Sequence, residues 1–258
     1  MKPHRLRKTK PYAARIAFGL AMMLCVIVVY AVVPSLRAAT VGVERAIIRV
    51  AAIKGPIIAR AFLFHVPFRR QQHALSCEVA SLRTALAGIN VHVPEWDLWL
   101  SLPKDQTRKQ TTKAGVIWGD PSEGFVGNVD GRMPSTGYGV FIDPIAEVAQ
   151  LYASTTRLRV NDTYAIDAAL SAKHPIVAWS VIGSLPPRSY AWKTPAGKSI
   201  TAPAYEHTVV IVGYRGTVER FEGIYLIDPL TSLRYEPWGE FLERTEPFAY
   251  VGLEVAPR

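Results

Sequence analysis

The sequence predicts an α+β domain, with helices in its first part and strands in its second, preceded by one N-terminal transmembrane helix. An uncharged apolar run covers residues 16–33. Apolar residues at helical spacing follow at residues 78–87, 142–151 and 164–173. Short runs rich in valine and isoleucine, typical of strands, come last, at residues 175–182, 208–214 and 223–227. The length of 258 residues suits one sizeable domain with an appendage.

The apolar run indicates a membrane anchor at residues 16–36. It holds 18 residues without a charge and is followed by Pro34. A helix of about 20 residues spans a bilayer, whereas the apolar part of a cleaved signal peptide has roughly 7–15 residues. We therefore expect a retained anchor, with cleavage after the small residues Ala38 and Ala39 as the alternative.

The charges around this run predict its orientation. Residues 1–15 carry six basic residues and no acidic one. Because basic residues stay on the cytoplasmic side, residues 1–15 are expected to be a cytoplasmic tail. The main domain would then lie outside the cytoplasm, held at the cell membrane by a single pass.

Residues 37–63 are expected to form a juxtamembrane amphipathic segment. Within them, apolar residues recur at helical spacing, at Val43, Ile47, Val50, Ile53 and Ile57. Such a helix, which also carries arginines, can lie along lipid headgroups; a connector packed on the domain is the alternative. The domain itself is then assigned to residues 64–258.

Charge and cysteine content exclude several classes of protein. The net charge is +9, but residues 71–258 hold 17 basic and 20 acidic side chains, a net of −3. A nucleic-acid-binding surface on the domain is therefore not expected. Two cysteines, one of them inside the apolar run, exclude a disulfide framework. The histidines and the acidic loop at residues 118–130 lack metal-ligand spacing, so neither a metal nor a cofactor is expected.

Cys77 and His207 are the candidate catalytic pair. Cys77 immediately precedes a predicted helix, whose N-terminal dipole would lower the pKa of the thiol. His207 opens a predicted strand 130 residues later, and Asp228 ends the next strand. A hairpin that turns at residues 215–219 would bring His207 and Asp228 together, so that the carboxylate could orient the imidazole.

Gln71, six residues before Cys77, is the candidate donor to an oxyanion, with Gln72 as the competing choice. Residues 119–139 hold six glycines and are expected to form a long ordered loop that walls the cleft.

Four segments carry a resemblance to a known family. Residues 66–82 (VPFRRQQHALSCEVASL) resemble the nucleophile segment of the bacteriocin-processing, papain-like cysteine peptidases. Residues 206–214 (EHTVVIVGY) and 225–229 (YLIDP) resemble the histidine and aspartate segments, and residues 175–179 (PIVAW) the preceding strand. The resemblance implies a papain-like fold, with Cys77 as nucleophile, His207 as base, Asp228 as orienting group and Gln71 as oxyanion donor. It departs at Glu78, where that family usually has glycine.

The expected function is therefore that of a membrane-anchored cysteine peptidase that acts on a peptide or protein substrate. Specificity for leader peptides is not carried over, because no transporter segment accompanies the domain in this sequence. An envelope amidase or acyltransferase with the same triad is one alternative. An anchored peptide-binding protein without catalysis is the other.

Overall fold

The computed structural model describes residues 61–63, 65–183 and 188–258. The predicted tail, anchor and most of the juxtamembrane segment lie outside these residues. Among the residues that the structure does describe, no helix is long and apolar enough to cross a bilayer.

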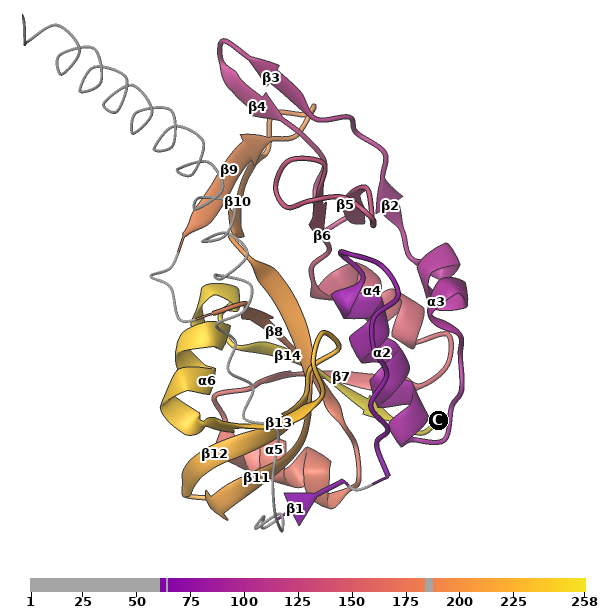
Figure 1. The fold of residues 1–258 in the computed structure, drawn as a ribbon, viewed down its shortest axis with the longest axis vertical. Helices are drawn as coiled ribbons and strands as arrows, with labels where there is room; N and C mark the ends of the chain where they lie inside the picture. The colour runs from indigo at the N-terminus through magenta and orange to yellow at the C-terminus, as the bar shows by residue number, and fades with distance from the viewer. Residues whose placement is uncertain (1–60, 64, 184–187) are drawn as a thin grey trace, which may run out of the picture. The chain divides into compact units, whose positions relative to one another are not determined.

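A seven-stranded sheet forms the centre of the fold, in the order β13-β12-β11-β8-β14-β7, with β1 paired to β11 (Figure 1). The valine- and isoleucine-rich runs form its buried strands, as the sequence predicts. The strands are β1 (Ala61–Phe62), β7 (Ser154–Arg159), β8 (Ile176–Val181), β11 (Glu206–Thr217), β12 (Arg220–Ile227), β13 (Leu233–Pro237) and β14 (Val251–Ala256).

Helices pack on this sheet and bury its apolar side chains. The three predicted helices are present as α2 (Cys77–Gly88), α4 (Ile142–Ala149) and α5 (Thr163–Ser171). Two further helices, α3 (Glu95–Ser101) and α6 (Trp238–Thr245), and the short 3-10 helix η1 (Glu246–Phe248) were not predicted. Helix α2 lies against β11 and β8, and α6 lies against β12 and β8.

Two smaller sheets extend the domain toward the top of Figure 1. One has the order β10-β9-β4-β3 and the other β2-β5-β6. Their strands are β2 (Lys104–Asp105), β3 (Gln110–Thr112), β4 (Gly115–Ile117), β5 (Phe125–Gly127), β6 (Gly137–Gly139), β9 (Ser189–Lys193) and β10 (Ser199–Pro203). Strands β5 and β6 lie inside the segment predicted to be a loop, so that prediction was only partly right.

The start of the sheet differs from the sequence-based domain boundary. Ala61 and Phe62 are strand rather than helix and pair with Tyr214 and Gly213 of β11. The next residue, Leu63, is buried in the core, and its N–H donates to the Val212 carbonyl at 2.7 Å. Backbone pairing with an available strand edge overrides the helical spacing at this end.

We therefore expect removal of residues 1–60 and removal of residues 1–63 to give proteins of different stability. The longer truncation removes the Leu63 side chain from the core, which costs about 2 kcal/mol and lowers the melting temperature by roughly 4–8 °C. Thermal unfolding of the two truncated chains measures the difference. Equal melting temperatures would show that β1 adds nothing to the fold.

Candidate active site

Cys77 is the first residue of α2, whereas the sequence predicted that the helix would begin one residue later. The turn before it is held by hydrogen bonds: the His73 N–H donates to Ser76 Oγ at 3.2 Å, and this hydroxyl donates to Glu95 Oε1 at 2.6 Å. The Cys77 side chain is 5% exposed, so only a small part of it reaches the surface.

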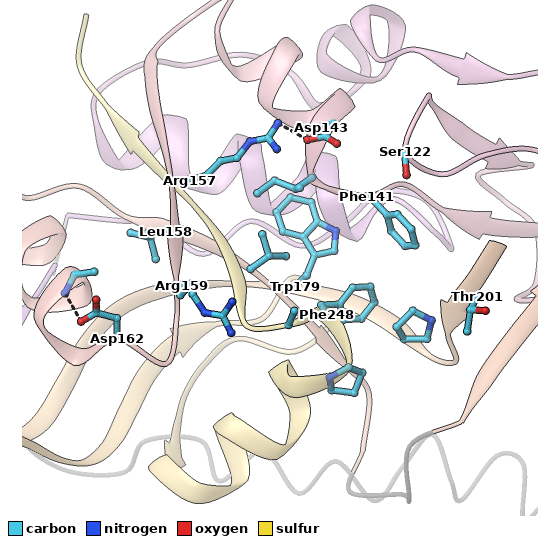
Figure 2. A pocket seen from close by; sticks show the side chains of 16 residues that line it. Ser122, Phe141, Asp143, Arg157, Leu158, Arg159, Asp162, Trp179, Thr201 and Phe248 are labelled. Carbon is cyan, nitrogen blue, oxygen red and sulfur yellow. Dashed lines mark hydrogen bonds and ion pairs between the residues drawn. The ribbon is translucent and has the colours of Figure 1, made fainter. Parts of the chain in front are cut away.

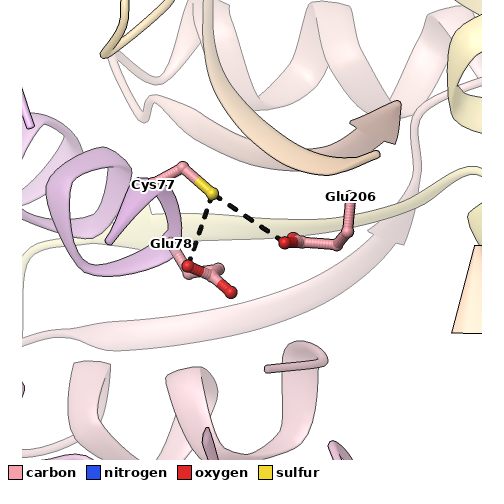
Figure 3. Close-up of side chains that lie close together, drawn as sticks. All are labelled: Cys77, Glu78 and Glu206. Atoms are coloured by element: carbon pink, nitrogen blue, oxygen red, sulfur yellow. Dashed lines mark hydrogen bonds between the residues drawn. The ribbon is translucent and has the colours of Figure 1, made fainter. Parts of the chain in front are cut away.

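Two carboxyl groups contact the Cys77 sulfur (Figure 3). Sγ lies 3.4 Å from Glu78 Oε2 and 3.9 Å from Glu206 Oε2. The backbone N–H of Thr208 also hydrogen-bonds the sulfur. Glu206 and Thr208 are the neighbours of His207 in β11, and their side chains face α2. The His207 side chain, between them, points to the opposite face of the strand, where it meets Asp228.

These surroundings correct the expectation of an acidic thiol. Burial raises the pKa of Cys77 well above its usual range, and the Glu206 and Glu78 carboxyl groups raise it further. Burial likewise raises the pKa of Glu78 to about 7, although a hydrogen bond from the Val140 N–H opposes this rise. Burial and the adjacent Glu78 raise the pKa of Glu206 well above its usual range. At neutral pH the thiol in this arrangement is therefore protonated, because desolvation and nearby acids outweigh the helix dipole.

The end of β6 closes over this carboxyl pair. The Val140 N–H donates to Glu78 Oε1 at 2.8 Å. A Cβ atom at Gly139 would lie 2.6 Å from Glu78 Oε1 and 2.7 Å from Glu206 Oε2. Gly139 also has φ +134, so only glycine fits here without displacing the carboxyl groups.

His207 and Asp228 form the pair that the hairpin argument predicts. Strands β11 and β12 are antiparallel and turn at Val218 and Glu219. His207 Nε2 lies 2.9 Å from Asp228 Oδ1, and both side chains are buried. Burial would raise the pKa of Asp228, but His207 and Arg234 hold it well below its usual range. Asp228 is therefore an ionised acceptor that fixes the imidazole.

Alternating buried charges continue from Asp228 to α6. Arg234 Nη2 lies 3.5 Å from Asp228 Oδ2, and Arg234 Nη1 lies 3.1 Å from Glu236 Oε2. Arg244 Nη1 donates to both Glu236 oxygens, at 2.9 and 2.7 Å. Arg244 Nε also donates to the Val181 carbonyl at 2.8 Å. This network was not visible in the sequence, since its members come from the turn after β12, from β13, from α6 and from β8.

The structure does not bring all four predicted catalytic residues into contact. Among the described side chains, Cys77 and His207 are not hydrogen-bonded to each other. Gln71 is joined to the aspartate turn through its backbone, whose N–H donates to the Pro229 carbonyl at 3.0 Å. Its side-chain Nε2, however, donates to the His73 and Ala74 carbonyls at 2.7 and 3.1 Å.

Three polar residues of the acidic loop at residues 118–130 have partners in the structure. Asp120 pairs with Lys198 at 2.6 Å, and Asp130 pairs with His73 at 2.9 Å. Asn128 Oδ1 accepts from the Asp130 N–H at 3.0 Å.

A pocket of about 750 Å³ is lined by Phe141, the residue that follows Val140, and by Trp179 (Figure 2). Phe141, Trp179 and Phe248 are among its lining side chains, together with Arg157 and Arg159. The Trp179 Nε1–H donates to the Val140 carbonyl at 3.1 Å, whereas the Val140 N–H donates to Glu78 Oε1. One short backbone segment thus contacts both the pocket wall and the carboxyl pair.

Comparison with known proteins agrees with this fold. Residues 64–250 match the Peptidase C39-like family. A structure described as a C39-like peptidase from Bacillus anthracis is 25% identical, with a TM-score of 0.64, and the match covers 77% of this chain and 98% of that one. A double glycine motif protease from an AMS/PCAT transporter, in complex with the leader peptide, is 16% identical with a TM-score of 0.43, and the match covers 78% of this chain and 97% of that one. The search of curated proteins gave no match. By its sequence over most of its length, the chain belongs to the Peptidase C39-like family.

Proposed function

We propose that this protein is a cysteine peptidase that hydrolyses peptide bonds, with Cys77 as nucleophile and His207 and Asp228 as the imidazole–carboxylate pair. The main support is the buried 2.9 Å contact between His207 Nε2 and Asp228 Oδ1. It is further supported by the position of Cys77 at a helix N-terminus beside the same strand. The aromatic and arginine-lined pocket next to Val140 is the proposed site for a substrate side chain.

The pairing of Nε2 with Asp228 defines the proton path. An ionised carboxylate only accepts, so Nε2 carries the proton and Nδ1 is the free base. In the proposed cycle, Nδ1 takes the proton of Cys77; because His207 points to the face of β11 opposite to Glu206 and Thr208, this transfer requires the start of β11 to rearrange and not a rotation of the Cys77 side chain alone. The thiolate attacks the amide carbonyl, and the imidazolium donates its proton to the departing amine. Water, deprotonated by the imidazole, then hydrolyses the thioester.

A peptide that carries an electrophile, such as an epoxide, tests this proposal. We expect one molecule to be attached per chain, with mass spectrometry placing it on Cys77. The electrophile alone, without the peptide part, should label Cys77 far more slowly. Labelling of Cys77 at the rate of a free thiol, independent of the peptide part, would contradict a peptidase site.

We propose the Gln71 amide as a donor to the oxyanion, together with N–H groups at the start of α2. Gln71→Ala should then lower kcat by about 100-fold with little change in KM. Gln72→Ala is the matched control, because the Gln72 backbone N–H, not its side chain, donates to Glu95 Oε1. Equal small effects of the two changes would show that the Gln71 amide only ties its loop to His73 and Ala74.

We also propose that residues 16–36 anchor the protein in the cell membrane, with the catalytic domain outside the cytoplasm. The support is the uncharged run after six basic residues. A reporter that is active only outside the cytoplasm should be active when fused after Arg258. Activity of a cytoplasm-only reporter at the same position would reverse the orientation.

A further inference from the structure

Three potential metal ligands converge at the start of α2, although their sequence spacing gives no sign of a metal site. Cys77, Glu78 and Glu206 place one ligand atom each within 4.8 Å of one another, and all three residues are buried (Figure 3). Glu206 is 129 residues from Cys77 and reaches it from β11. No other group of three such residues converges in this way within the part of the chain that the structure describes.

The separations fit a tetrahedral ion. A zinc-class cation lies about 2.3 Å from a thiolate and about 2.1 Å from a carboxylate oxygen, so tetrahedral angles put sulfur and oxygen about 3.6 Å apart. The observed distances from Sγ are 3.4 Å to Glu78 Oε2 and 3.9 Å to Glu206 Oε2. Small side-chain rotations would bring both onto one ion.

The cluster also lacks positive charge and has an unused ligand atom. Glu206 is 3% exposed, and its Oε1 has no hydrogen-bond partner. In Figure 3 its carboxyl end extends toward the sulfur and Glu78. Among the described residues, no basic side chain pairs with Glu78 or Glu206, whereas Glu95, Asp228 and Glu236 each lie beside an arginine. Buried carboxylates need a counter-ion or a proton, and a divalent cation would supply the charge.

We propose that Cys77, Glu78 and Glu206 bind a divalent cation of the zinc class, with a fourth position open to water. Thiolate and carboxylate together suit zinc and cobalt better than magnesium or calcium, which prefer oxygen ligands alone. The ion displaces the thiol proton and binds the sulfur, which is then not free to attack a substrate. If the proposed peptidase activity holds, the loaded protein is therefore inactive, and removal of the metal restores the nucleophile.

Cobalt(II) reports on this site without any measurement of turnover. Titration of the full-length protein should produce one near-ultraviolet sulfur-to-cobalt band per chain. Cys77→Ser should abolish the band, and Glu206→Gln should weaken cobalt binding by at least about 10-fold through loss of a ligand. Zinc should displace the cobalt and remove the band.

Two control variants distinguish this site from cobalt binding at other residues. His73→Ala removes the His73–Asp130 pair, and His207→Ala removes the imidazole that pairs with Asp228. Both variants should keep the band at wild-type affinity, with folding checked by thermal unfolding. Loss of the band in His207→Ala together with its retention in Glu206→Gln would overturn the proposal in favour of a Cys77–His207 site. Absence of a band in the wild type would overturn it outright. Neither outcome bears on labelling of Cys77 by the electrophilic peptide, which tests the peptidase function separately.

Discussion

Replacement of Cys77 by alanine is expected to abolish peptide hydrolysis and leave the fold intact. Cys77 is the only cysteine among the described residues, so no other thiol there can form the acyl intermediate. The loss should be on the order of 10⁴-fold or more, as for other nucleophiles that act within one catalytic unit. Hydrolysis of a peptide library, followed by mass spectrometry, measures it. Cys25→Ala is the matched control, because it removes the only other cysteine and should leave turnover unchanged.

Replacement of His207 and replacement of Asp228 should lower turnover to different extents. His207→Ala should be nearly as severe as Cys77→Ala, since the thiol loses its proton acceptor. Asp228→Asn should be milder, because the amide keeps the shape of the carboxyl group and only the charge beside the imidazole is lost. Unchanged turnover in His207→Ala would show that the base is another group, and the carboxyl groups that contact the sulfur would be the first to test.

Replacement of Arg244 by methionine is expected to cause the largest loss of stability. Arg244 is 8% exposed, and its guanidinium pairs with both Glu236 oxygens and with the Val181 carbonyl. Breaking a buried pair leaves a carboxylate in low dielectric with fewer partners, which costs about 3 kcal/mol. The melting temperature should fall by about 6–12 °C.

Arg215→Met is the matched control for Arg244→Met. Arg215 pairs with Glu222 across the β11–β12 hairpin, but about half of each side chain is exposed, so water replaces the lost partner. Its melting temperature should stay close to that of the wild type. Equal shifts in the two variants would mean that the Glu236 carboxyl is hydrated or protonated after Arg244 is removed.

Local chemistry in the sequence determined much of the fold. Apolar residues at helical spacing predicted α2, α4 and α5, and runs of valine and isoleucine predicted β8, β11 and β12. The hairpin between β11 and β12 follows from two strands joined by a short polar turn, and this alone was enough to pair His207 with Asp228. Helix α3, helix α6 and the strands inside the glycine-rich segment were missed, because they are short and are stabilised by neighbours distant in the chain.

The chemistry around the thiol was decided only by the tertiary structure. The sequence showed Glu78 beside Cys77 and Glu206 beside His207, but not that both carboxyl groups contact the sulfur. That contact depends on how α2 packs on β11 and on the space left by Gly139. The direction of the Cys77 pKa shift was accordingly predicted wrongly. The helix dipole can be read from local sequence, whereas desolvation and neighbouring charges arise only when distant segments enclose the group and exclude water.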